Sequence, residues 1–88
     1  MTIEIFTLGN CPRCEELAEF LSGLSVPFDT LSLDDAETIT ELRINGVFVT
    51  EAPVLHIGDT WLLPSQIFQN GYLAIDQIAG LIEEGHDV

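Results

Sequence analysis

The chain has 88 residues, and 47% of them are hydrophobic, which is enough for one compact core but leaves no room for a second domain. We therefore expect a single domain over residues 1–88. Fifteen acidic residues face two arginines and no lysine, giving a formal net charge of -13, which argues against nucleic acid as a partner because clustered Lys and Arg bind its phosphates.

The first part of the chain predicts a strand, a helix and a second strand. Residues 3–8 are almost continuously apolar, as in a strand at or near the centre of a sheet. Over residues 12–24, apolar side chains recur at three- and four-residue spacing, which predicts a helix, and Gly23 and Pro27 favour its end. Residues 27–33 alternate loosely and predict a second strand, parallel to the first, after a right-handed crossover.

The middle of the chain predicts a helix and a hairpin. Asp34 followed by Glu37 resembles a capping box with Asp in place of Ser or Thr, and it predicts a helix that runs to about Ile44. Residues 53–57 and 60–63 predict two antiparallel strands joined by a tight turn.

The end of the chain predicts two further helices. Pro64 opens a short helix, with Ser65 as its expected cap, and Asn70-Gly71 ends it. A final helix with apolar residues at helical spacing, closed by Gly85, would cover the sheet. Without the short helix at Pro64, the predicted order of elements is β-α-β-α-β-β-α, which is an α/β fold.

Cys11 and Cys14 are the only cysteines, and they lie where the first strand gives way to the first helix. Pro12 is favourable at the first helical position, so Cys11 is the predicted N-cap. Its sulfur would face the free N–H groups of Arg13 and Cys14, which stabilise an anion. Cys11 is therefore the candidate nucleophile, and Cys14, on the apolar helix face, is the candidate resolving thiol. Arg13 favours the Cys11 thiolate, whereas three nearby carboxylates oppose it: Glu15, Glu16 and Glu19.

Other uses of two cysteines fit the sequence less well. A structural disulfide that closes a four-residue loop would contribute only about 2 kcal/mol in the chain-entropy model. A zinc site needs four ligands, and the remaining candidates, His56 and His86, are distant in sequence. We expect His56 to lie on the sheet surface or to pack there. An iron-sulfur cluster shared across a dimer remains an alternative, but we expect a monomer with no metal.

The sequence also bears on location and partners. The apolar runs are far shorter than the roughly 20 residues of a membrane span, so no membrane partner is expected. The first residues lack a basic stretch followed by a hydrophobic region, and we expect a cytoplasmic protein. Its acidity either serves solubility alone or attracts a partner with a basic docking face.

The short first strand, the C-P-x-C motif over residues 11–14, and Ala52-Pro53 before a strand that leads into a hairpin together resemble glutaredoxin and its thioredoxin-fold relatives. The resemblance covers essentially the whole chain. It implies a thioredoxin fold with a central four-stranded mixed sheet flanked by helices. It also implies a small dithiol-disulfide oxidoreductase whose redox-active disulfide, Cys11–Cys14, is its only redox group, with no further cofactor.

The resemblance assigns roles to the surrounding residues. Pro53 should follow a cis peptide bond and lie against the cysteine pair, and the backbone of Ala52 should pair with the bound substrate. Pro12 and Arg13 would modulate the thiolate. Family geometry also places the apolar loop of Val47, Phe48 and Val49 beside the cysteines, where an apolar rim would suit an extended substrate segment. Core packing explains at least some of these three residues and is the better interpretation of Val49. Trp61 is expected to be core or half-buried packing.

The departures from the family pattern narrow the choice of substrate. Many glutaredoxins carry a glutathione-binding Lys three residues before the first cysteine, where this chain has Leu8. Their Gly-Gly pair and Asp after the hairpin fall on Leu63, Pro64 and Gln66. The tryptophan that precedes the thioredoxin motif is replaced by Asn10. We therefore expect poor use of glutathione and a disulfide-containing protein as substrate.

Two functional hypotheses follow. The first is a protein disulfide reductase that a reductase or small thiol recycles, with glutaredoxin-like electron donors to ribonucleotide reductase as the nearest analogue. The second is a non-catalytic binding module, or a metal or iron-sulfur carrier, that uses the same Cys11 and Cys14.

Overall fold

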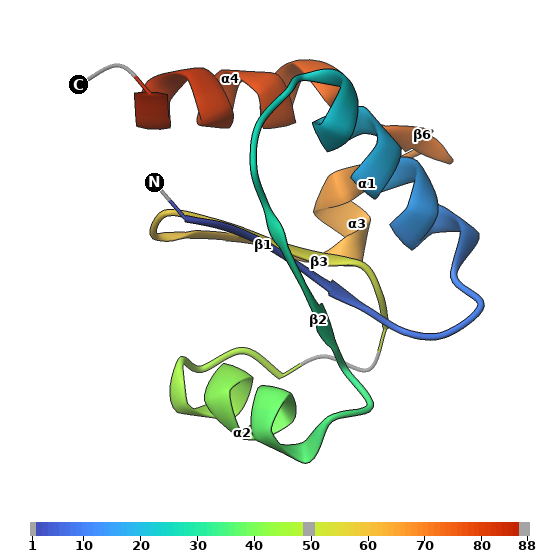
Figure 1. Cartoon of the computed structure of the whole chain (residues 1–88). Coiled ribbons are helices and arrows are strands. Elements are labelled where there is room, and N and C mark those ends of the chain that lie inside the picture. Colours follow the sequence, from blue (N-terminus) through green and yellow to red (C-terminus); the bar gives the residue numbers. More distant parts are fainter. Residues whose placement is uncertain (1, 49–50, 87–88) are drawn as a thin grey trace.

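A four-stranded mixed sheet forms the centre of the computed structural model, which describes residues 2–48 and 51–86 (Figure 1). The strand order is β2-β1-β3-β4. β1 (Ile3–Thr7) pairs in parallel with β2 (Asp29–Ser32) and antiparallel with β3 (Val54–Ile57), and β3 pairs antiparallel with β4 (Thr60–Leu62). The parallel first pair, the hairpin and the mixed sheet are as the sequence predicts.

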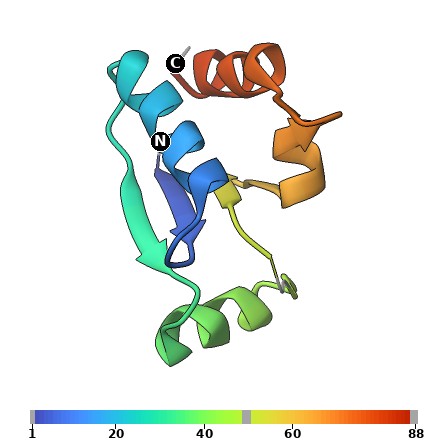
Figure 2. The ribbon, with the colours of Figure 1, turned by 90° about the vertical axis from the view of Figure 1, so that its right-hand side faces the viewer.

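Helices cover both faces of this sheet (Figures 1 and 2). α1 (Pro12–Gly23), the short α3 (Pro64–Ile67) and α4 (Ile75–His86) lie on one face, and α2 (Ala36–Ile44) lies alone on the other. Among the described residues, no helix is both long and apolar enough to cross a bilayer.

Strand alternation divides the interior into two cores. Ile3 and Ile5 of β1 pack on the side of α1, α3 and α4, together with Leu17 of α1 and Ile78 of α4. Phe6 points to the opposite face, because successive side chains of a strand alternate, and packs with a smaller group of residues around α2: Leu33, Leu42, Val47 and Val54. Burial on both faces explains why β1 is almost continuously apolar.

A second, two-stranded sheet follows α3 and was not predicted. β5 (Phe68–Gln69) pairs antiparallel with β6 (Tyr72–Leu73). Asn70 and Gly71 between them have φ values of 55° and 82°, the left-handed conformation that a two-residue type I′ hairpin turn requires at both positions. The sequence prediction that Asn70-Gly71 only ends a helix is therefore incomplete, since the pair also reverses the chain.

Three predicted helix ends are also corrected. Asp35, not Asp34, caps α2, and its Oδ1 accepts from the Glu37 N–H at 3.0 Å. The cap moves by one residue because the preceding residues form a turn in which the Asp35 N–H donates to the Ser32 carbonyl. α4 continues through Gly85 to His86.

The N-cap of α3 is Leu63, and Ser65 lies inside the helix. Gln66 serves the helix start instead, because its Oε1 accepts from the Leu63 N–H at 2.9 Å. The predicted Ser65 cap is therefore wrong. The residue at the third helical position reaches back to the chain before the helix, which is half of a capping box.

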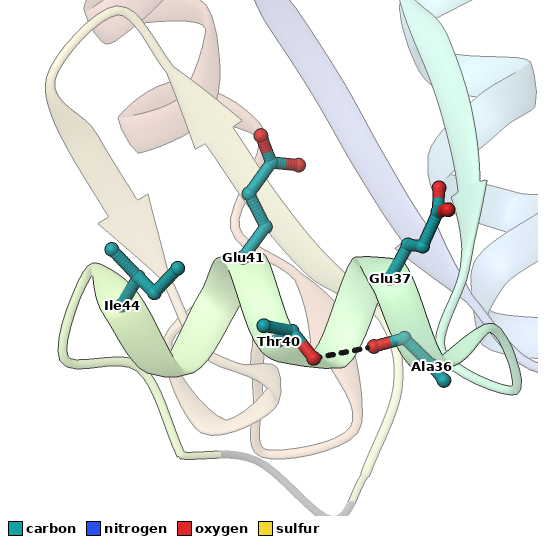
Figure 3. Close-up of a pocket in the computed structure, with 5 residues that line it drawn as sticks. All are labelled: Ala36, Glu37, Thr40, Glu41 and Ile44. Atoms are coloured by element: carbon teal, nitrogen blue, oxygen red, sulfur yellow. Dashed lines mark hydrogen bonds between the residues drawn. The ribbon is translucent and has the colours of Figure 1, made fainter.

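One side of α2 is exposed and largely polar (Figure 3). Glu37 and Glu41 project from it, one turn apart, and the Thr40 hydroxyl donates to the Ala36 carbonyl at 2.8 Å. Ile44, at the end of the helix, is 79% exposed. The inner side buries Thr38 and Leu42, so α2 contacts the sheet through one narrow face.

The packing of α4 can be tested with two isoleucines of the same helix. Ile78 is fully buried, whereas Ile75 is 51% exposed. We expect Ile78→Ala to lower the free energy of unfolding by about 2–4 kcal/mol and Ile75→Ala to lower it by about 1 kcal/mol or less. Urea denaturation followed by the fluorescence of the single tryptophan measures both. Equal losses would contradict the observed orientation of α4.

Candidate active site

The first helix begins directly beyond the end of a central strand. β1 ends at Thr7, and a three-residue loop leads to the helix through Asn10, whose φ of 54° turns the chain. Cys11 is extended, with φ of -117° and ψ of 95°, and Pro12 follows as the first helical residue. An extended residue before Pro is the expected geometry for an N-cap.

Cys11 is the N-cap of α1, as the sequence predicts. Its Sγ accepts a hydrogen bond from the Cys14 N–H at 3.1 Å, which satisfies one of the free donors of the helix start. The two cysteines are joined by a disulfide with their Cα atoms 5.2 Å apart. Cys14 is only 5% exposed, whereas Cys11 is half-buried. Of the two sulfurs, Cys11 is therefore the more accessible.

Two hollows adjoin Cys11. The larger, of about 550 Å³, lies between the loop and helix start on one side and Glu51 and Ala52 on the other. The smaller, of about 230 Å³, lies along the first turns of α1 and includes Cys14 and Glu15. Leu8 lines both hollows. Cys11 thus lines two concave surfaces on which a substrate chain could rest.

The Ala52-Pro53 segment lies on the far side of the larger hollow. The peptide bond between the two residues is cis, as the resemblance implies. Pro53 is fully buried, and Ala52 lines the hollow together with Cys11. The structure therefore brings Ala52 and Cys11, which are distant in sequence, to one surface.

Arg13 extends toward the unpredicted hairpin. Its guanidinium carbon lies 5.3 Å from the centre of the Phe68 ring, which is a cation–π contact. Arg13 also lines the larger hollow. Phe68 was not predicted as a site residue because β5 was not predicted, although the Asn70-Gly71 pair is a known hairpin signal.

The apolar loop before Pro53 splits between core and surface. Val47 is buried and packs in the core beside α2, with Phe6 and Leu42. Phe48 is 76% exposed, so it is free to form a surface contact. The prediction for Val49 lies outside the described residues.

His56 belongs to the opposite face of the sheet. Its Nδ1 lies 2.9 Å from Glu4 Oε1 of the neighbouring strand, and its ring stacks on Trp61 at 3.8 Å between centroids. Trp61 is half-buried, as expected. In the part of the chain that the structure describes, no three Cys, His, Asp or Glu residues are grouped as a metal site. The side chain of His86 lies outside that part.

Comparisons with known proteins give matches at the level of structure. No family profile and no curated protein sequence matches the chain, but several solved structures do. The thioredoxin-like protein BC3987 matches with a TM-score of 0.71 and 21% identity, over 91% of this chain and 99% of that one. Glutaredoxin from Archaeoglobus fulgidus matches with a TM-score of 0.62 and 25% identity, over 91% and 84%.

A third solved structure is NrdH-redoxin from Escherichia coli, a glutaredoxin-like protein described as having a thioredoxin-like activity profile. It matches with a TM-score of 0.59 and 25% identity, over 70% of this chain and 80% of that one. The chain has the thioredoxin fold, and its structural neighbours are thioredoxin-like and glutaredoxin-like proteins. In this thioredoxin fold, a CxxC-spaced disulfide stands at the start of α1.

The unequal exposure of the two cysteines predicts unequal reactivity after reduction. We expect limiting iodoacetamide to label Cys11 about tenfold faster than Cys14, because Cys11 is accessible and a helix N-terminus stabilises a thiolate by up to about 2 kcal/mol. Mass spectrometry of the digested protein locates the label. Cys14→Ser should retain the fast reaction and Cys11→Ser should lose it, and preferential labelling of Cys14 would contradict the assignment.

Proposed function

We propose that this protein is a dithiol-disulfide oxidoreductase that reduces protein disulfides through Cys11 and Cys14. The observation that carries the proposal is the disulfide at the start of α1, in which the more exposed sulfur is also the helix cap. A structural crosslink would gain little from so short a loop. An accessible sulfur that accepts a backbone N–H bond is instead suited to act as a thiolate.

The proposed reaction has two exchange steps. In the reduced protein, the Cys11 thiolate attacks one sulfur of the substrate disulfide, a Cys11–substrate bond forms, and the second substrate sulfur leaves as a thiolate that takes up a proton. Cys14 then loses its proton and attacks Cys11 Sγ, which forms the Cys11–Cys14 disulfide and releases the first substrate sulfur. Two electrons pass from the protein to the substrate.

The cysteine neighbours have separate proposed roles. Pro12 fixes the backbone at the helix start, and the Cys14 N–H that now bonds the Cys11 sulfur would stabilise its thiolate. The backbone of Ala52, held by the buried Pro53, would pair with an extended substrate segment in the larger hollow. Arg13 would add a positive charge near the thiolate.

The surroundings of the disulfide favour a protein substrate over glutathione. Leu8 lines both hollows beside Cys11, at the position where many glutaredoxins carry a Lys. Gln66, at the position of their Asp, uses its side chain to cap α3. These changes replace a cation and a carboxylate, either of which could contribute about 1.5–3 kcal/mol through a charged hydrogen bond.

The proposed setting is the cytoplasm, where a reducing environment would keep the dithiol available. A dithiol reductase or a small thiol would recycle the protein after each turnover. A narrower proposal, taken from the resemblance to glutaredoxin-like electron donors, is that the chain passes electrons to an enzyme such as ribonucleotide reductase. The likeness to a glutaredoxin-like protein with a thioredoxin-like activity profile is compatible with this proposal. Neither of the two thiol-disulfide exchange steps needs a metal or other cofactor.

The function can be tested with insulin as the disulfide substrate and dithiothreitol as the reductant. We expect the wild type to accelerate insulin reduction, and Cys11→Ser to fall to the rate of dithiothreitol alone because no nucleophile remains. Cys14→Ser should accumulate a mixed disulfide with its substrate, since the resolving thiol is missing. An inactive wild type that instead carries stoichiometric zinc or an iron-sulfur absorbance would favour the carrier hypothesis.

The glutathione prediction can be tested by restoring one charge. In a glutathione-coupled assay we expect turnover about tenfold or more below that of an ordinary glutaredoxin. Leu8→Lys should raise this turnover by about threefold to tenfold, because residue 8 lines both hollows beside Cys11 and its new ammonium group could reach a carboxylate of glutathione there. Leu8→Met, which adds no charge, is the matched control. Wild-type turnover equal to that of the glutaredoxin would refute the prediction.

A further inference from the structure

Each hollow beside Cys11 has one carboxylate on its wall. Glu51 lines the larger hollow together with Ala52, and Glu15 lines the smaller one, one turn into α1. Both residues are exposed. They come from separate segments and line separate hollows, both of which include Cys11, so a bound chain would meet a carboxylate whichever hollow it enters.

The nearby cation does not cancel these charges. Arg13 lines the larger hollow, but its guanidinium stacks on Phe68 of the hairpin. Within the described residues, no salt bridge joins Arg13 to Glu15 or Glu51. The single contact there at salt-bridge distance is between His56 and Glu4, on the opposite face of the sheet. The two carboxylates are therefore free to bind a cation that a substrate brings.

We propose that Glu15 and Glu51 select protein disulfides whose reacting cysteine is flanked by Lys or Arg. This inference rests on the proposed function and names its substrate class. Since Cys11 fixes where the substrate sulfur must lie, the residues next to that sulfur reach the two hollows, where each carboxylate can accept a charge-assisted hydrogen bond. Segments with Asp or Glu at these positions are repelled.

The general acidity of the protein has a different effect from this local selection. A net charge of -13 attracts any basic chain over a long range, wherever the individual carboxylates lie. Local recognition requires the particular carboxylates beside Cys11. A test must therefore remove the same amount of charge at two places, one beside the disulfide and one remote from it.

The test uses single-turnover reduction of short peptides by pre-reduced protein. Each peptide has one cysteine joined to 2-thiopyridine and differs only in its two flanking residues, which are Lys, Gln or Glu. Cys11 attacks the peptide sulfur, the disulfide bond between the peptide and thiopyridine breaks, and the leaving group takes up a proton to become pyridine-2-thione, whose absorbance is followed. Cys14 then closes the protein disulfide and frees the peptide thiol.

We expect the wild type to react about tenfold faster with the Lys peptide than with the Glu peptide at low salt, with the ratio falling as salt is added. In the double variant Glu15→Gln/Glu51→Gln, the ratio should fall to about twofold or threefold. In Glu37→Gln/Glu41→Gln, it should stay near the wild-type value, because these residues project from α2 on the other side of the sheet (Figure 3).

The ratio between peptides is the decisive quantity. Removing Glu15 can also change the reactivity of the Cys11 thiol, but such a change affects all three peptides alike and cancels in the ratio. An equal fall of the Lys-to-Glu rate ratio in the two double variants would overturn the inference and leave the proposed function intact. Equal rates with the two peptides in the wild type would do the same. Failure to reduce any of the peptides would remove the proposed function and the inference together.

Discussion

The site depends on one hydrogen bond, from the Cys14 N–H to the Cys11 sulfur. A helix start has free N–H groups that need acceptors, and Ser, Thr, Asp or Asn usually supplies one. Here a thiol takes that place, so the residue that ends the loop and begins α1 also carries the redox chemistry. The same donor that favours the helix in the disulfide form would stabilise an anion after reduction. Folding of α1 and activation of Cys11 therefore rest on a shared contact.

The pairing of β1 with β3 brings the two halves of the site together. Because these strands are antiparallel, the C-terminal end of β1 and the N-terminal end of β3 lie side by side at one end of the sheet, where Phe6 pairs with Val54. The chain continues from β1 to Cys11 and reaches β3 from Ala52, so both segments emerge side by side. Phe6 and Val54 pack with Leu42 of α2, which stabilises this end of the sheet on the face that α2 covers. The smaller core is thus a support for the redox centre.

The sequence predicted the features that local patterns encode. The buried strand, the Cys11 cap and the helix after Pro12 follow from alternation and capping, whose signals lie within a few residues. The hairpin at Asn70-Gly71 was missed because strands of two residues show no alternation, and a helix end and a type I′ turn favour the same pair of residues. The contact of Arg13 with Phe68 and the place of Glu51 depend on tertiary structure. No local pattern could supply them.

The scarcity of cationic side chains leaves the surroundings of Cys11 negatively charged. The chain has only Arg13 and Arg43 among 88 residues. Arg43 belongs to α2 on the far side of the sheet, and Arg13 is engaged with an aromatic ring. An anionic small thiol would thus meet carboxylates beside Cys11 and few hydrogen-bond donors that could bind its own carboxylates. A basic chain would instead find hydrogen-bond acceptors in both hollows. Discrimination between the two can therefore arise from repulsion as much as from attraction, which is how closely related binding sites separate similar ligands.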